Sequence, residues 1–204
     1  MSGVTVYMEG GGDSKDTKAA LRQGMGDFLA PLRDNARRKS WRWKLVCCGG
    51  RDAAFKGFRN AVQNGDNAIV VLLVDAEAPV NSPNRVHLQS RDSWDLQFAS
   101  DDLVHLMVQT MEAWIVADPD ALNAYYGHRF RENVLPRTQN LEMVSKTAIA
   151  SALEEATRDT QKGKYHKIRH ASDLLKRIDQ QKVQQRCPGC ALMFDVLGQA
   201  IQGA

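Results

Sequence analysis

The most constraining feature of the chain is an unbroken apolar run at residues 69–74 that stops at Asp75. Its side chains are apolar without alternation, which is typical of a strand buried on both faces. Strands of this kind lie at the centre of parallel sheets, whose two faces are covered by helices. The run therefore predicts an α/β fold in which Asp75 stands at the carboxyl end of a central strand.

The segments around this run alternate between strand and helix patterns. Residues 4–8, 41–48 and 103–108 are further strand candidates. Helical spacing follows the first two of them, and the first helix carries Leu21, Met25, Phe28, Leu29 and Leu32 on one face, with Asp13 or Ser14 as its N-cap. Strands alternating with helices favour right-handed crossovers and a Rossmann-like core with a mostly parallel sheet of about four strands.

The second half of the chain has a mostly helical pattern. We expect a long loop at 78–102 with a short helix near Trp94. We expect helices at Met111–Val116, Pro119–Tyr126, 142–158, 171–185 and 190–202, with a basic segment at 162–170. The predicted organisation is an α/β core at 1–117 with a helical C-terminal extension at 118–204 packed on it, or one single domain.

Acidic residues follow two of the predicted strands. Glu9 ends the first strand, and Asp75 and Glu77 follow the central one. Residues two apart in an extended chain point to the same side, and parallel strands place their carboxyl ends at one edge. Like charges at close range disfavour one another unless a cation neutralises them, and Mg²⁺ prefers carboxylate oxygens. These residues therefore predict a Mg²⁺ or Mn²⁺ site suited to phosphodiester cleavage.

Glu9 to Asp13 after the first strand, together with Asp75 and Glu77 after the apolar strand, resemble the TOPRIM superfamily, which includes catalytic domains of topoisomerases and bacterial primases and the nucleases of the OLD group. More narrowly, the chain resembles a family of small TOPRIM-like bacterial proteins of formerly unknown function. The stretches that match span most of the chain; they are residues 6–15, 48–58, 72–77, 105–118, 121–127 and 162–175. The resemblance implies a TOPRIM core. It makes Glu9 a metal ligand or general acid/base and Asp75 a metal ligand. Glu77 stands where an aspartate is usual.

The resemblance also implies a biological setting. It predicts a Mg²⁺-dependent nuclease of DNA or RNA that serves as an effector of anti-phage defence. An ABC-type ATPase from a neighbouring gene is the expected partner, as in the PARIS system. Two alternatives stay open: a non-catalytic regulatory or adaptor subunit of such an ATPase, and a primase-like nucleotidyl-transfer enzyme. The substrate (DNA, RNA or tRNA), the number of metal ions and the oligomeric state, including a homodimer, also stay open.

Weaker candidates surround these acids. Glu112 is either a further metal ligand or an ordinary acid at a helix N-terminus. The remaining candidates are expected to contact phosphate or nucleic acid, although a charge run is often only a solvated face; they are Gly10, Gly11, Gly12, Arg51, Lys164, Lys167 and His170.

Charge and cysteine content set broader limits. The formal net charge of +3 permits an anionic partner without requiring one. Cys187 and Cys190 have the spacing of half a zinc site, but a turn before the last helix explains them as well. Without a recognisable targeting segment, reduced thiols and a cytoplasmic location are expected, with no membrane partner.

Overall fold

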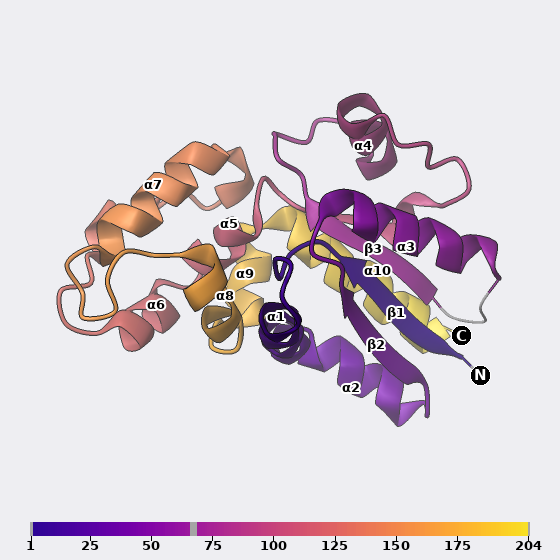
Figure 1. The fold of residues 1–204 in the computed structure, drawn as a ribbon, viewed down its shortest axis with the longest axis horizontal. Helices are drawn as coiled ribbons and strands as arrows, with labels where there is room; N and C mark the ends of the chain where they lie inside the picture. Colours follow the sequence, from indigo (N-terminus) through magenta and orange to yellow (C-terminus); the bar gives the residue numbers. More distant parts are fainter. Residues whose placement is uncertain (1, 66–68, 204) are drawn as a thin grey trace.

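A four-stranded sheet forms the centre of the computed structural model, which describes residues 2–65 and 69–203. The strands are β1 (Gly3–Met8), β2 (Arg42–Cys47), β3 (Ile69–Asp75) and β4 (Val104–Met107). They lie in the order β2-β1-β3-β4, and every neighbouring pair is parallel (Figure 1). The prediction of an α/β fold with a parallel sheet of about four strands is confirmed.

Helices connect and extend the sheet. They are α1 (Lys15–Phe28), α2 (Ala30–Arg38), α3 (Arg51–Gln63), α4 (Asn84–Asp92), α5 (Met111–Val116), α6 (Pro119–Tyr126), α7 (Lys146–Thr157), α8 (Lys167–Leu175), α9 (Gln180–Arg186) and α10 (Pro188–Gly203). Ser14 is the N-cap of α1, where its hydroxyl accepts a hydrogen bond from the Thr17 amide (3.1 Å). In Figure 1 the helices α6 and α7 lie to one side of the sheet, while α10 returns behind it.

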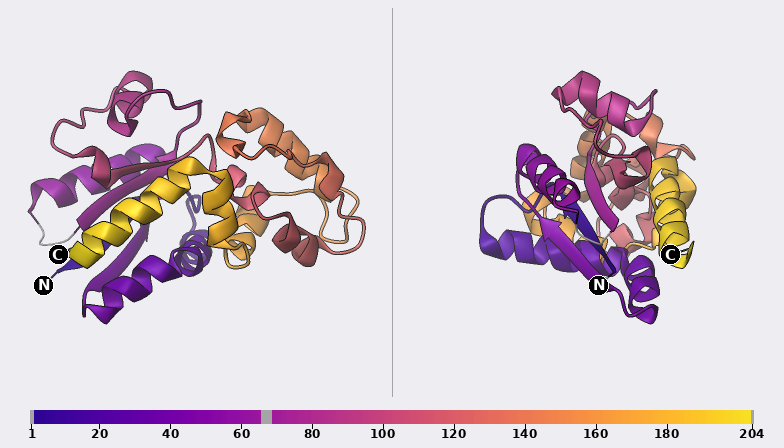
Figure 2. Two further views of the ribbon diagram at one scale, coloured as in Figure 1. Left: turned by 180° about the vertical axis from the view of Figure 1, so that it is seen from behind. Right: turned by 90° about the vertical axis from the view of Figure 1, so that its right-hand side faces the viewer.

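Apolar side chains fill both faces of the sheet. Val71 and Leu73 of β3 belong to one buried cluster, whereas Val70, Leu72 and Val74 belong to another on the opposite face. The first cluster also contains residues of α1, α2, α5, α8 and α10, and the second contains residues of α3 and α4. The left view of Figure 2, in which the molecule is seen from behind, shows α10 lying along the sheet. The uninterrupted apolar pattern of β3 is therefore explained by helices on both sides.

The short helix expected near Trp94 is α4, which ends at Asp92; the Trp94 ring stacks on Phe55, with 4.5 Å between centroids. Two other predicted element boundaries were wrong. The helix expected from residue 142 begins at Lys146, after the Ser145 N-cap. The segment 171–185 contains parts of two helices, α8 and α9, whose buried apolar residues continue the same spacing across the break.

The close crossing of α1 and α8 depends on Gly24. A Cβ added at Gly24 would collide with the carbonyl oxygen of Ser172 in α8, whereas one added at Gly26 would meet nothing within 4 Å. We expect Gly24→Ala to destabilise the protein by about 1–3 kcal/mol, because α8 must move away. The control Gly26→Ala should instead stabilise it by about 0.5–1 kcal/mol through helix propensity. Urea unfolding measures the change in unfolding free energy for both variants. Equal changes would contradict the close approach of α1 and α8 at Gly24.

Within residues 2–65 and 69–203, no helix has both the length and the apolar character needed to cross a lipid bilayer.

Candidate metal centre

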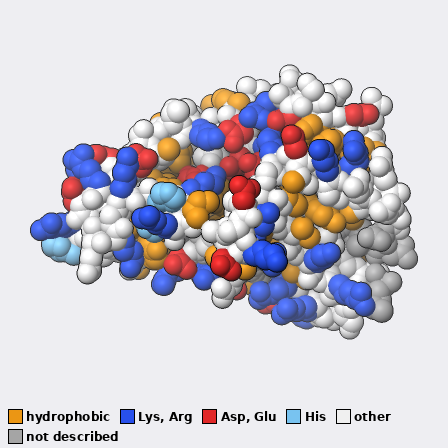
Figure 3. Space-filling model, viewed as in Figure 1, with side chains coloured by type: hydrophobic (Ala, Val, Ile, Leu, Met, Phe, Trp, Pro, Cys, Tyr) orange, Lys and Arg blue, Asp and Glu red, His pale blue; other side chains and the backbone are white. Residues whose placement is uncertain are grey.

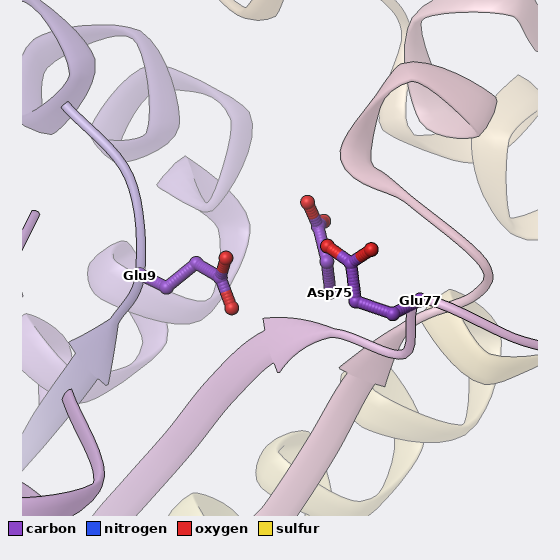
Figure 4. Close-up of side chains that lie close together, drawn as sticks. All are labelled: Glu9, Asp75 and Glu77. Carbon is purple, nitrogen blue, oxygen red and sulfur yellow. The ribbon is translucent and has the colours of Figure 1, made fainter. Parts of the chain in front are cut away.

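Three carboxylates meet at the carboxyl edge of the sheet. Glu9 follows β1, Asp75 ends β3, and Glu77 lies two residues later. One oxygen from each lies within 4.8 Å of the others, and Figure 4 shows the Glu9 side chain pointing across to the other two. In Figure 3 acidic side chains gather near the middle of the visible face, with lysine and arginine side chains beside them. The sequence-based expectation that these three residues converge therefore agrees with the structure.

Asp75 is directed into the protein by the pleat of β3. Its position matches that of Val71 and Leu73, so it points toward the face covered by α1 and α8. The side chain is nearly fully buried, and its Oδ1 atom accepts a hydrogen bond from the Met111 amide at 2.7 Å. Burial raises the pKa of this carboxyl above its ordinary value, although the Lys167 ammonium partly offsets that shift.

Glu77 reaches the cluster by a different route from the one expected. Strand β3 ends at Asp75, and Glu77 has a left-handed backbone with φ of 65°. Its amide donates a hydrogen bond to the carbonyl of Gln109 (2.7 Å), which holds this turn against the chain after β4. The extended-chain argument for Glu77 was therefore wrong, although the side chain does reach the site.

Arg51 holds Glu9 in place. The Arg51 Nη1 atom donates to Glu9 Oε2 at 2.9 Å, and the rest of its guanidinium binds both oxygens of Asp92 at 2.8 Å. Nη1 also donates to the backbone carbonyl of Asp75, and the guanidinium lies over the Trp94 ring, 5.1 Å from its centroid. Arg51 thus donates four hydrogen bonds to protein acceptors and positions Glu9, and its contact with phosphate stays a prediction.

Two lysines complete the charge balance. Lys167 Nζ lies between two carboxylates, 3.1 Å from Asp75 and 3.2 Å from Glu112, and those charges raise its pKa despite partial burial. Lys146 forms an ion pair with Glu77. Each of the three clustered carboxylates therefore has a cationic partner, which explains how they lie together in the protein alone.

Glu112 stands outside the group of three. Its Oε2 atom accepts from the Thr110 hydroxyl (2.5 Å), and its Oε1 atom accepts from the Tyr165 hydroxyl (3.1 Å). Burial disfavours its charge, but Lys167 and Thr110 outweigh that cost and lower its pKa. The geometry thus makes Glu112 the anchor of Lys167, separated from the candidate metal position by the lysine head group.

The glycine loop after β1 is fixed from two sides. Gly10 exchanges backbone hydrogen bonds with Gly49, and the Thr17 hydroxyl donates to the Gly11 carbonyl. Gly10, Gly11 and Gly12 all have positive φ, which glycine adopts without strain. Because the Gly10 amide is used by Gly49, the predicted backbone approach to phosphate is limited to Gly11 and Gly12.

The residues of the basic segment at 162–170 differ in their exposure. Lys164 is exposed and pairs with Glu154 (2.5 Å). His170 is buried: its Nδ1 atom accepts from the Tyr126 hydroxyl (2.9 Å) and from the His166 amide (3.2 Å), and burial lowers its pKa. The His170 ring thus belongs to a packed aromatic cluster, and its contact with nucleic acid stays a prediction.

Sequence patterns did not reveal several residues of the site. Lys146, Asp92, Thr110 and Tyr165 all contact the acids or their partners. Lys146 is 69 residues from Glu77 and Asp92 is 41 from Arg51, so no local pattern links them. The one hint in the sequence was that clustered acids require cationic partners, and this requirement does not identify a particular lysine.

The cysteines stay apart from the acidic cluster. Cys187 and Cys190 are buried free thiols, and burial raises the pKa of both. In the part of the chain that the structure describes, no cysteine belongs to a group of three or more metal-ligating side chains. The spacing of Cys187 and Cys190 is accounted for by packing at the start of α10, where the Cys187 thiol points to the Ala113 carbonyl.

The donor set of the cluster fits a hard divalent cation. Mg²⁺ and Mn²⁺ prefer carboxylate oxygens and water. Among the described residues, hydrogen bonds reach only the Oε2 atoms of Glu9 and Glu77, which leaves both Oε1 atoms for a ligand. Asp75 uses both oxygens, but a carboxylate has about four lone-pair sites. The three residues therefore retain enough acceptor capacity to share an ion.

Fold and site together define an α/β protein with a carboxylate cluster at the carboxyl edge of a parallel sheet. The family described as a domain of unknown function, DUF4276, matches residues 8–198, so the chain belongs to this family. Comparisons with curated proteins and with solved structures found no match.

Proposed function

We propose that the protein is a Mg²⁺-dependent phosphodiesterase of the TOPRIM type that cleaves DNA or RNA. The observation that carries this proposal is the group of Glu9, Asp75 and Glu77, whose oxygens lie within 4.8 Å at the carboxyl edge of the sheet. That edge is where parallel α/β sheets bind their ligands. Mn²⁺ is the expected substitute ion, because it accepts the same oxygen ligands.

Each residue has a chemical role in this proposal. A bound divalent ion would supply an activated water and neutralise charge on the phosphate. Glu9 is suited to serve either as a ligand of that ion or as a general base, because its Oε2 atom is held by Arg51; burial and the neighbouring Asp75 charge raise its pKa, which favours proton acceptance. Lys167 is suited to stabilise negative charge on the phosphate, because its ammonium lies beside Asp75 and its side chain is 43% exposed.

The proposed biological role is an effector of anti-phage defence in the cytoplasm, working with an ABC-type ATPase. Its support is the sequence resemblance to small TOPRIM-like proteins. Co-purification of the chain with the product of a neighbouring ATPase gene tests this part separately from catalysis.

A second candidate function rests on the charge balance of the site. Glu9, Asp75 and Glu77 each already have a cationic partner, in Arg51, Lys167 and Lys146. A charge network that is satisfied by the protein alone favours a regulatory or adaptor subunit that keeps the fold without binding metal. Metal binding separates the two candidates directly.

The test of catalysis is an assay with end-labelled single-stranded DNA, duplex DNA, RNA and tRNA, in Mg²⁺, in Mn²⁺ and in EDTA. We expect cleavage of at least one substrate with either ion and none in EDTA. Nucleoside triphosphates in a parallel reaction test for primase-like products. Absence of cleavage with every substrate, including in the presence of the ATPase, would favour the adaptor function.

A further inference from the structure

An apolar cavity opens directly beside the carboxylates. It has a volume of about 180 Å³, and Glu9, Asp75 and the glycine loop form part of its wall. Apolar side chains from α1, β4, α5 and α8 form much of the rest: Leu21, Met107, Met111, Ile168 and Ala171. Ligand clefts for drug-sized molecules measure about 300–1,000 Å³, so this cavity suits a single ring system rather than a whole nucleotide.

Ile168 lies at the mouth of the cavity. Its side chain belongs to the lining, and the residue is 47% exposed. It directly follows Lys167, whose ammonium contacts Asp75. A flat ring that enters the cavity would cover Ile168 and remove its apolar surface from water.

A second and more polar cavity adjoins the other side of Lys167. Its volume is about 370 Å³, and its charged or titratable lining residues are Lys146, His166 and Lys167 together with Glu112 and Glu154. Lys167 is therefore shared by both cavities, with the carboxylates beside it. A chain that carries apolar rings and phosphates could place a ring in the first cavity and a neighbouring phosphate against the lysines of the second.

We propose that the apolar cavity receives one unstacked base of a single-stranded nucleic acid while the adjoining phosphate lies beside the Lys167 ammonium, which the two cavities share. This inference rests on the proposed function and deepens it, because it names the substrate class. A base in a duplex must leave its stack and its pair to enter such a cavity, at a cost of a few kcal/mol. Single-stranded or unpaired segments do not bear that cost and are therefore preferred over duplex.

Binding of labelled oligonucleotides tests this inference without depending on cleavage. Fluorescence anisotropy is measured in EDTA, with single-stranded DNA, single-stranded RNA, duplex DNA and a fully abasic strand of equal length. The wild-type protein should bind single strands at least about 10-fold more tightly than the duplex or the abasic strand, since stacking contributes about 1–3 kcal/mol per base. The DNA and RNA arms identify which strand is preferred.

Two matched variants locate the effect. Ile168→Ala removes the aliphatic surface at the cavity mouth and should weaken binding of single strands about 3–10-fold, with no change for the abasic strand. Leu192→Ala is the control, because Leu192 is similarly exposed at 53% but lies in α10 outside both cavities. Both positions are exposed, so both variants should fold, and thermal unfolding verifies this.

The outcomes separate this inference from the proposed function. Equal affinity for single strand, duplex and abasic strand, or equal effects of the two variants, would overturn the base-binding cavity even if metal-dependent cleavage is found. Base-dependent binding that is lost in Ile168→Ala would support the cavity even if no cleavage is found.

Discussion

Asp75→Asn should lower Mg²⁺-dependent cleavage per folded molecule by at least about 100-fold. The asparagine can still accept the hydrogen bond from the Met111 amide, but it loses the ion pair with Lys167 and removes the negative charge that an ion requires. Residues that only support metal ligands contribute about 10–100-fold, so a direct ligand should reach or exceed that range. Cleavage rates at saturating Mg²⁺ provide the measurement.

The matched control for this variant is Asp101→Asn. Asp101 lies just before β4, at the opposite end of that strand from the carboxylates, and pairs with Arg85 (3.1 Å). This control should retain cleavage within about twofold, since exposed ion pairs contribute about 0–1 kcal/mol to stability. A similar loss in both variants would argue that a global effect, rather than ligand loss, lowers the rate.

Lys167→Met should destabilise the metal-free protein by about 2–3 kcal/mol. The substitution leaves Asp75 and Glu112, both nearly buried, without their shared cation. Breaking a fully buried pair costs about 3–5 kcal/mol, and the partial exposure of Lys167 reduces this value through solvent screening. For a chain of this size, the melting temperature should fall by about 4–12 °C in EDTA.

Mg²⁺ should then restore much of that lost stability. In the variant the ion no longer competes with an ammonium, so saturating Mg²⁺ should raise the melting temperature more than it does in the wild type. Lys176→Met is the control: Lys176 lies at the end of the same helix and pairs with the exposed Asp173 (3.2 Å). Its effect should stay below about 1 kcal/mol and be independent of Mg²⁺. An equal rise in melting temperature with Mg²⁺ in the wild type and in Lys167→Met would contradict competition between the ion and the Lys167 ammonium.

Most of the fold was predictable because its signals are local. The apolar pattern of β3 reflects burial on both faces, and the helical spacing of Leu21, Met25 and Phe28 reflects one buried stripe. Element boundaries were predicted wrongly where tertiary contacts decide them. The break between α8 and α9 is one case, because the Asp179 amide at the start of α9 donates a hydrogen bond to Asp118.

The acidic half of the site was predictable, but its cationic half was not. Parallel strands bring their carboxyl ends to one edge, so Glu9 and Asp75 follow from topology alone. The partners depend on how distant loops return to that edge. Lys146 reaches Glu77 from the start of α7, and Asp92 reaches Arg51 from the end of α4. Lys167 was singled out as basic, but its position between Asp75 and Glu112 required the packing of α8 on α1.

Calorimetric titration of the protein with Mn²⁺ tests most directly whether the three carboxylates hold a divalent ion. The wild type and Asp101→Asn should bind with the same affinity, Asp75→Asn should give no saturable heat, and Lys167→Met should bind more tightly than the wild type. Failure of the wild type to bind Mn²⁺, or equal binding by Asp75→Asn, would contradict a divalent cation held by Glu9, Asp75 and Glu77.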